Sequence, residues 1–249
     1  MSNLRTLTLV LLATVFIPLS AQVARGQVYL QTDGIDDYVE APDSDDFSID
    51  TTGGLTIGAW MKPGALYFPT PEGSGYVHWL GKGGPRQHEW TFRMYSRDNT
   101  EDRGNRISFY VFNPDGGLGV GSYFQDPITA GEWIHVVGVA DSERAYIYKN
   151  GVLRDSDRYA GAITSRNGTA PLRMGTRDLR SYFLGGLAEV RVWNRPLTAE
   201  EIADWHAFGI VPRDGLVAEW LLNEEVGTIA RDTTGAHDGA ISGGYRPVR

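Results

Sequence analysis

The chain has 249 residues, of which 41% are hydrophobic and 22% are charged, with 31 Gly and no Cys. An apolar content of this size is enough for one sizeable core, which excludes a disordered chain and a collagen-like repeat. The lack of cysteine excludes a disulfide framework, a thiolate metal site and a cysteine nucleophile.

Residues 1–26 have the pattern of a cleavable signal peptide. Arg5 gives a positive start, Leu7 to Leu19 is apolar apart from two threonines, and Ala24-Arg25-Gly26 offers small residues for cleavage. A membrane anchor is the rival interpretation, but the run is too short for a helix to cross about 30 Å of hydrocarbon. We therefore expect a secreted or periplasmic chain of bacterial type, with no membrane span in its mature part.

The mature chain is expected to be acidic. Removal of the leader takes away Arg5 and Arg25 and no acidic residue, which leaves 21 basic against 31 acidic residues, a formal net charge of −10. A surface of this sign repels phosphate backbones, so nucleic acid is not an expected partner.

Short runs rich in Val, Ile, Thr and aromatic residues, separated by Gly, Asp, Asn and Pro, predict strands along the mature chain. Asn150-Gly151 predicts a tight hairpin between two of them. One short helix is predicted near residues 198–208, where Thr198 and Glu201 form a capping box. Many strands and one helix favour an all-β jelly-roll sandwich. The predicted strands are Gly54–Lys62, Glu89–Tyr95, Arg106–Phe112, Trp133–Ala140, Ala145–Asn150, Leu172–Gly175, Leu187–Trp193 and Gly215–Leu221.

Four stretches match the strand motifs of one family, in that family's order. They are LQTDGIDDYVEAPDS (Leu30–Ser44), LTIGAWMKP (Leu55–Pro63), GEWIHVVGVADSERAYIYKNGVL (Gly131–Leu153) and GGLAEVRVWNRPLTAEEI (Gly185–Ile202). Together they resemble the laminin-G-like (LamG-like) family of concanavalin A-type jelly rolls. The resemblance implies a two-sheet sandwich over residues 27–210.

Residues 211–249 resemble a sequence segment that in this family precedes the opening strand. The order of segments along this chain is therefore permuted relative to the family. The segment either adds strands to the same sandwich or is the remnant of a second copy. We expect it to pack on the same sandwich, because Trp220, Leu221 and Leu222 would otherwise be exposed.

The sequence lacks the catalytic pattern of this fold. Relatives that cleave β-glucans carry Glu-x-Asp-x-(x)-Glu on one strand, which sets two carboxylates about 5–5.5 Å apart. No Glu of this chain is followed two positions later by Asp, and the His-Glu-x-x-His and Gly-x-Ser-x-Gly motifs are absent. We therefore expect no enzyme activity.

A structural calcium ion is the one cofactor that the sequence indicates. The resemblance implies a site built from an early carboxylate, a carbonyl near Gly54 and an acidic residue in the late strand, where this chain has Ala188. The remaining candidate ligands are Asp33, the Gly54 carbonyl and Asp232. Turn chemistry explains the same aspartates without a metal.

A sugar-binding surface needs exposed flat rings with polar groups beside them. Most tryptophans match core positions of the family. In the alternating run from Trp90 to Tyr95, Trp90 lies on one face and Arg93 and Tyr95 on the other, and either face could form a groove or pack in the core. The candidate ligand-binding residues are Trp79, Trp90, Tyr95, Arg86, His88 and Tyr182.

These observations predict an exported, non-catalytic module that binds carbohydrate on a cell surface or in a matrix. The ligand follows from the fold alone and is an analogy. A protein-interaction or adhesion module that contacts a surface protein is the alternative, and a polysaccharide-degrading enzyme is the third candidate.

Overall fold

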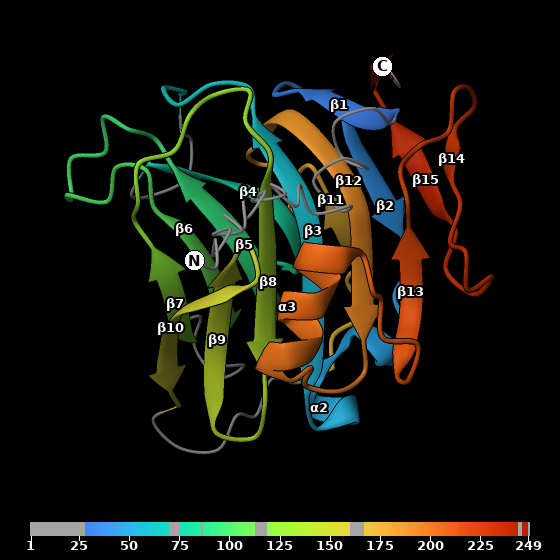
Figure 1. The fold of residues 1–249 in the computed structure, drawn as a ribbon. Helices are drawn as coiled ribbons and strands as arrows, with labels where there is room; N and C mark the ends of the chain where they lie inside the picture. The colour runs from blue at the N-terminus through green and yellow to red at the C-terminus, as the bar shows by residue number, and fades with distance from the viewer. Residues whose placement is uncertain are drawn as a thin grey trace, which may run out of the picture.

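The computed structural model describes residues 28–69, 75–85, 87–112, 119–159 and 167–243, together with the backbone of residues 246–248. The predicted leader and Arg86 lie outside these ranges. Two antiparallel sheets face each other across a common core (Figure 1). The all-β sandwich predicted from the sequence is confirmed.

The first sheet is formed mostly by the strands that the sequence motifs indicate. Its spatial order is β10 (Val152–Arg158), β9 (Arg144–Lys149), β8 (Ile134–Ala140), β3 (Leu55–Pro63), β12 (Leu184–Trp193), β1 (Tyr29–Asp33) and β16 (Arg246–Val248), and β13 (Leu216–Trp220) also pairs with β12.

The second sheet packs against the first. Its spatial order is β14 (Ile229–Ala230), β15 (Gly239–Ser242), β2 (Tyr38–Ala41), β11 (Leu172–Met174), β4 (Tyr76–Gly84), β5 (Gln87–Tyr95), β6 (Ile107–Phe112) and β7 (Gly119–Phe124). Its inward residues, such as Trp79, Phe92 and Phe109, form the main core with those of the first sheet.

The predicted helix is α3 (Ala199–Phe208), and its capping box of Thr198 and Glu201 is present. It lies across the outer face of the first sheet (Figure 1), where Trp205 packs in a second apolar cluster with Trp193. Gly58 makes this packing feasible, because a Cβ there would lie 2.5 Å from the Trp205 ring. The structure adds a 3-10 turn, η1 (Asp45–Phe47), and a four-residue helix, α2 (Ile49–Thr52).

The C-terminal segment contributes strands to both sheets. β13 pairs with β12 and β16 pairs with β1 in the first sheet, whereas β15 pairs with β2 in the second. Trp220 is fully buried between them. In the described part of the chain, no helix has the length and apolar character that a membrane span requires.

Candidate functional site

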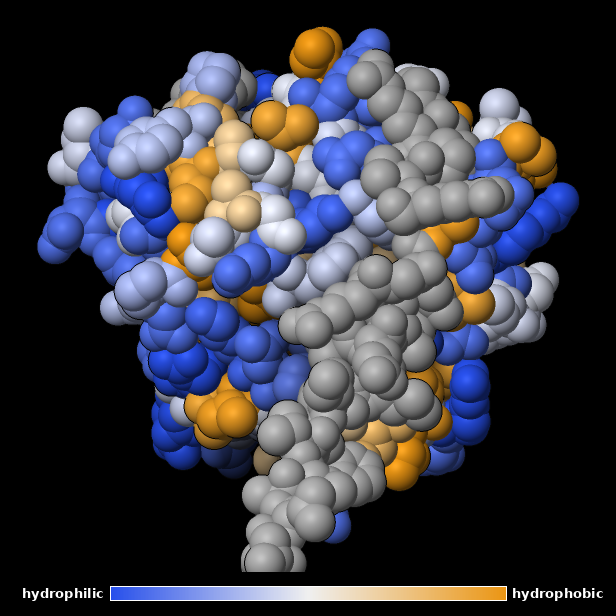
Figure 2. Space-filling model, turned by 45° about the horizontal axis from the view of Figure 1, so that its top comes forward, coloured by the Kyte–Doolittle hydropathy of each residue, from blue (hydrophilic) through white to orange (hydrophobic). Residues whose placement is uncertain are grey.

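A pocket of about 190 Å³ opens at the end of the sandwich where β1 and β3 end and β12 begins. Val77 and Met94 form part of its apolar wall. Figure 2 turns this end of the molecule toward the viewer and shows apolar side chains set among hydrophilic ones. The pocket is lined by Asp33, Gly34, Ala65, Tyr67, Phe68, Pro69, Val77, Met94, Tyr182, Phe183 and Leu184.

Aromatic side chains stand around this pocket. Tyr67 is 62% exposed, and Phe68 and Tyr182 are half-buried. The Arg97 guanidinium carbon lies 5.8 Å from the Tyr67 ring centre. Burial raises the pKa of Tyr182, with smaller contributions from Tyr38 and Asp36, so its hydroxyl stays protonated at neutral pH. Partly exposed rings of this kind offer apolar faces together with hydrogen-bonding groups.

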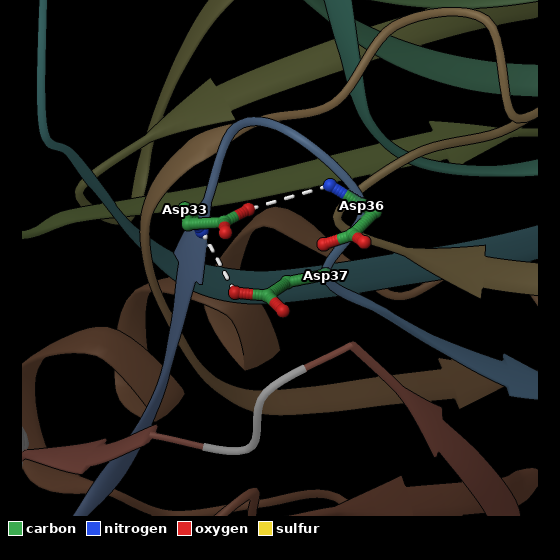
Figure 3. A group of neighbouring side chains, drawn as sticks. All are labelled: Asp33, Asp36 and Asp37. Carbon is green, nitrogen blue, oxygen red and sulfur yellow. Dashed lines mark hydrogen bonds between the residues drawn. The ribbon is translucent and has the colours of Figure 1, made fainter.

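Three aspartates of the β1–β2 turn lie beside the pocket, and Asp33 belongs to both (Figure 3). One carboxylate oxygen of each of Asp33, Asp36 and Asp37 lies within 4.8 Å of the others. The Asp33 backbone N–H donates to Asp37 Oδ2 at 3.0 Å, and Asp33 Oδ1 accepts from the N–H groups of Ile35 and Asp36. Part of the acidic cluster therefore serves to form the turn.

The donor set of this cluster fits calcium. Carboxylate oxygens on a loop are the hard ligands that calcium prefers, and loop carbonyls and water complete such sites. Asp33, Asp36 and Asp37 would hold the ion, which would supply positive charge at the mouth of the pocket.

The calcium ligands predicted from the sequence do not come together. Gly54 precedes β3 whereas Asp33 lies beside the far end of that nine-residue strand, about 30 Å away. The Gly54 carbonyl accepts a hydrogen bond from Thr52. Asp232 accepts hydrogen bonds from the backbone of Glu219 and of other residues in its turn. The prediction that Gly54 and Asp232 bind calcium with Asp33 is therefore corrected: both residues accept hydrogen bonds within their own turns.

Two of the predicted sugar-binding residues lie in the core. Trp79 and Trp90 are fully buried, and the Trp90 indole N–H donates to the Phe47 carbonyl at 2.9 Å. Neither ring can stack on a sugar, so this part of the prediction is corrected. Side chains alternate along β5 as predicted, and the face that carries Trp90 is the inner one, which packs against the first sheet.

The other face of β5 points away from the core. Tyr95 is 4% exposed and lies against Tyr76 of the neighbouring strand, with ring centres 5.3 Å apart. His88 is half-buried and stacks on Phe112 at 4.9 Å. Burial lowers the pKa of His88, and the nearby charge of Arg177 lowers it further.

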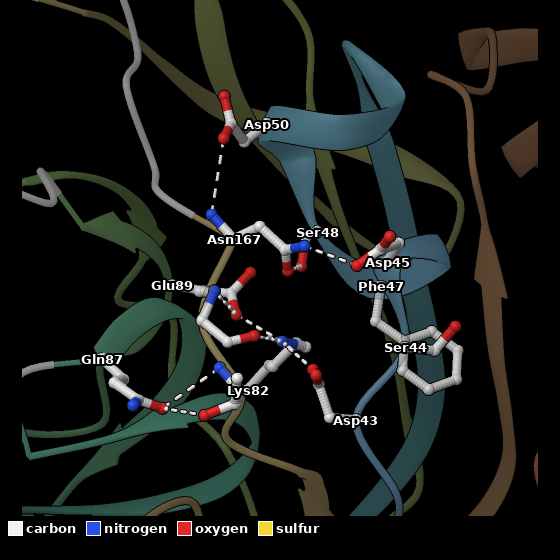
Figure 4. Close-up of polar contacts among 12 residues, drawn as sticks. Asp43, Ser44, Asp45, Phe47, Ser48, Asp50, Lys82, Gln87, Glu89 and Asn167 are labelled. Atoms are coloured by element: carbon white, nitrogen blue, oxygen red, sulfur yellow. Dashed lines mark hydrogen bonds and ion pairs between the residues drawn. The ribbon is translucent and has the colours of Figure 1, made fainter.

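Two carboxylates from distant parts of the sequence also meet, at a lysine (Figure 4). Lys82 Nζ lies 2.7 Å from Asp43 Oδ1 and pairs with Glu89. The Lys82 and Glu89 side chains are almost fully buried, and desolvation raises the pKa of Glu89 against the opposing charge of Lys82. Lys82 and Glu89 also bind the Gly168 backbone. The group therefore anchors loops to the second sheet and is not an open pair of acids.

The sequence prediction missed Tyr67 and Phe68. Both lie in the Ala65–Pro69 stretch, where no strand or helix pattern accounts for two adjacent aromatic residues. Aromatic residues in a loop that ends at proline are the signal that would have found them.

Comparison with known proteins agrees with this architecture. The laminin-G family model that is described as the concanavalin A-like lectin/glucanases superfamily matches residues 33–203. The chain belongs to this superfamily. The resemblance identified from the four sequence motifs is thereby confirmed. A search of curated protein sequences finds no match.

Solved structures of concanavalin A-like architecture resemble the chain in fold. A carbohydrate-binding protein candidate from Bacteroides ovatus aligns with a TM-score of 0.62 at 16% identity, over 90% of this chain and 62% of that one. The chain thus spans less than two thirds of that protein. The heptameric SAP-like pentraxin of Limulus polyphemus aligns with a TM-score of 0.55 at 16% identity, over 87% of this chain and 95% of the pentraxin.

Proposed function

We propose that this concanavalin A-like protein binds carbohydrate, without cleaving it, in the pocket at the end of the sandwich. The observation that carries the proposal is the combination of the exposed Tyr67 ring, the half-buried Tyr182 and the Asp33 carboxylate around one pocket. The likeness in fold to the Bacteroides ovatus carbohydrate-binding candidate supports the same ligand class.

Each wall of the pocket suits one part of a sugar. The rings of Tyr67 and Tyr182 offer flat faces on which the C–H groups of a pyranose can pack. The Asp33 carboxylate and the Tyr182 hydroxyl can hydrogen-bond sugar hydroxyls, and charged partners strengthen such bonds. Val77 and Met94 supply apolar contact behind them. Small-molecule sites commonly combine apolar walls with a few polar groups in this way.

The acid–base chemistry of glycoside hydrolysis has little support in the described residues. Hydrolysis needs two carboxyl groups that face a substrate. Asp43 and Glu89 do meet, but the ammonium of Lys82 lies between them and Glu89 is 1% exposed. Asp33, Asp36 and Asp37 also lie close together, but backbone N–H groups of their own turn donate to Asp33 and Asp37, and of the three only Asp33 lines the pocket. Binding without turnover is therefore the function that we propose.

We also propose that the protein is exported, with residues 1–26 as a cleaved signal peptide. This rests on the positive start, the apolar run and the small residues of the leader. Carbohydrate on a cell surface or in a matrix would then be the accessible ligand.

Glycan-array binding of the purified protein, followed by titration calorimetry of the best ligand, tests the pocket. Tyr67→Ala and Tyr182→Ala are each expected to weaken binding about tenfold or more, since each removes an aromatic platform. Tyr123→Ala is the matched control, because Tyr123 is 39% exposed and does not line the pocket. Unchanged affinity in both pocket variants, or turnover of the ligand, would contradict the proposal.

A further inference from the structure

The outer face of the second sheet carries a row of polar side chains that the carbohydrate pocket does not use. Arg93 of β5 stands in register with His78 of β4 on one side and with Ser108 of β6 on the other. The neighbouring inward residues Phe92 and Met94 are core. Arg93, His78 and Ser108 therefore share the face that points away from the core.

Two guanidinium groups lie near the same aromatic ring on this face. The Phe112 ring centre lies 5.3 Å from the Arg93 guanidinium carbon and 5.0 Å from that of Arg177. Arg93 also lies over the rings of Tyr76 and Tyr110, at 4.6 and 4.3 Å. Arg177 reaches the sheet because β4 has glycine beneath it, where a Cβ on Gly81 would lie 3.0 Å from the Arg177 side chain. Aromatic rings fix both guanidinium planes without occupying their N–H groups.

Several donors in this cluster have no acceptor among the described residues. They are Nε of Arg93, Nε and Nη1 of Arg177 and the hydroxyl of Ser108. Arg177 is only 4% exposed and Ser108 5%. A buried donor without a partner costs about 1–3 kcal/mol, and more when it is charged. These donor atoms have almost no exposed surface, so an oxyanion would accept hydrogen bonds from several of them only once the surrounding side chains move aside.

The charge of the cluster also favours an anion. Asp178 is the one carboxylate that pairs with these guanidiniums among the described residues, at 2.6 Å from Arg177 Nη2. Burial lowers the pKa of His78 well below its ordinary value, and the charges of Arg177 and Arg93 lower it further. The two arginines therefore leave an excess of positive charge on a chain whose formal net charge is −8.

The residues of the cluster differ in their burial. Arg93, Tyr76, Tyr110 and His88 are half-buried, whereas Arg177 lies deeper. A group that approaches from solvent would meet the Arg93 guanidinium first, and side chains would have to shift before it reached the donors of Arg177. The rings of Tyr76 and Tyr110 beside Arg93 would contact the sugar residue that carries the anionic group.

We propose that Arg93 and Arg177 form an anion subsite that binds the carboxylate or sulfate group of an acidic polysaccharide. The proposal rests on the proposed function, since it assigns the class of carbohydrate. The planar fork of arginine matches carboxylate and sulfate oxygens in pairs, which gives charge-assisted hydrogen bonds. A neutral glycan would leave the same donors unsatisfied, and this is the physical basis of the expected preference.

The test compares polygalacturonate, dextran sulfate and neutral dextran in titrations of the full protein. We expect one or both acidic polymers to bind, with an affinity that decreases as salt rises, and dextran to bind at least about tenfold more weakly. The tighter of the two acidic polymers identifies the anionic group as carboxylate or sulfate.

Variants then assign this preference to the cluster. Arg93→Gln and Arg177→Gln are each expected to weaken binding of the acidic polymer about tenfold or more. Arg106→Gln is the matched control, because Arg106 bonds to Gln125 and carries the same charge outside the cluster. Should a cluster variant not fold, the melting temperature of the unaltered protein decides, since galacturonate or galactose 6-sulfate, whichever carries the preferred group, should raise it and galactose should not.

The outcomes separate this inference from the pocket. Equal binding of acidic and neutral polymers, or full acidic binding in both cluster variants, overturns the anion subsite even if Tyr67→Ala still abolishes binding of a neutral glycan. Acidic binding that depends on Arg93 but is indifferent to Tyr67 supports the subsite and contradicts the pocket.

Discussion

The indole ring of Trp205 stands edge-on against the imidazole of His135, with ring centres 4.3 Å apart and planes at 85°. His135 lies on β8, fully buried beneath α3, and neither of its ring nitrogens has a hydrogen-bond partner among the described residues. Burial lowers the pKa of His135 well below its ordinary value, and the nearby His206 and Arg191 add to the effect. The folded protein therefore keeps this imidazole neutral.

Acidification is expected to destabilise the protein through His135. In the unfolded chain this group takes up a proton near its ordinary pKa of about 6.5, whereas the folded state resists protonation. The free energy of unfolding is therefore unaffected by His135 above about pH 6.5. Below that pH it falls by up to about 1.4 kcal/mol per pH unit. Melting temperatures of the protein and of His135→Phe at pH 7.5 and 5.0 test this. The variant should show a smaller drop, and an equal drop would contradict the assignment.

Glu219 of β13 is expected to affect stability at lower pH than His135. Burial alone would raise its pKa, but hydrogen bonds from Thr233, Arg191 and Arg213 and the charge of Arg191 outweigh it and lower the pKa to about 2. The resulting stabilisation is present above about pH 4.5 and is lost as the pH falls toward 2. Glu219→Gln should destabilise the protein by about 1.5–3 kcal/mol at pH 7, because it removes the charged acceptor of Arg191 and Thr233, while Arg191 keeps its ion pair with Glu189.

Urea unfolding at pH 7 and pH 3 measures this difference. The gap between the protein and Glu219→Gln should narrow at pH 3, because Glu219 of the unfolded chain is then mostly protonated, whereas the native carboxylate with its pKa of about 2 is still ionised. Glu200→Gln, an exposed substitution in the first turn of α3, is the control and should change stability by less than about 0.5 kcal/mol. A gap of equal size at both pH values would count against the interpretation.

Lys82 is expected to be required for folding stability and not for ligand binding. Lys82→Met removes the ammonium between Asp43 and Glu89, and the buried Glu89 carboxylate is left without its counter-charge. Loss of one partner of a buried ion pair costs about 3–5 kcal/mol. The double variant Lys82→Met with Glu89→Gln should recover part of this loss, and denaturant unfolding of the protein, the single variant and the double variant measures it. No recovery would show that the packing of Lys82, and not its charge, is what matters.

Calcium is expected to stabilise the β1–β2 turn. If Asp33, Asp36 and Asp37 hold the ion, added calcium should raise the melting temperature and a chelator should lower it again. Magnesium should have a smaller effect, because it requires near-octahedral coordination and gives up its bound water reluctantly. Asp36→Asn should abolish the calcium response, because Asp36 is exposed and its substitution should leave the fold intact. A melting temperature indifferent to both calcium and chelator would remove the metal from this site.

Features set by neighbours in the chain could be predicted from the sequence. The capping box of α3 depends on residues three positions apart, and it is present as expected. The hairpin at Asn150-Gly151 needs positive φ at both positions, and the values are 52° and 78°. The side-chain alternation of β5 was likewise readable from its sequence.

Features set by distant contacts could not. β4 was not predicted, because its last four residues include Gly81, Gly83 and Gly84, which read as a loop. Gly81 is required by tertiary crowding, since a Cβ there would lie 2.8 Å from the Thr91 hydroxyl. The pocket was missed for a similar reason, because its lining comes from segments as far apart as Asp33 and Tyr182.

The amino-acid pattern by itself determined the two-sheet class, the helix and its caps, and which residues alternate along a strand, because these depend on local backbone geometry and on spacing. Only the packing of one sheet on the other decided which face of each strand is buried in the core. That choice placed Trp90 in the core and left Arg93 outside, and it brought Tyr67, Tyr182 and Asp33 around one pocket. Burial is a property of both surfaces in a contact, and the sequence of one strand describes only one of them.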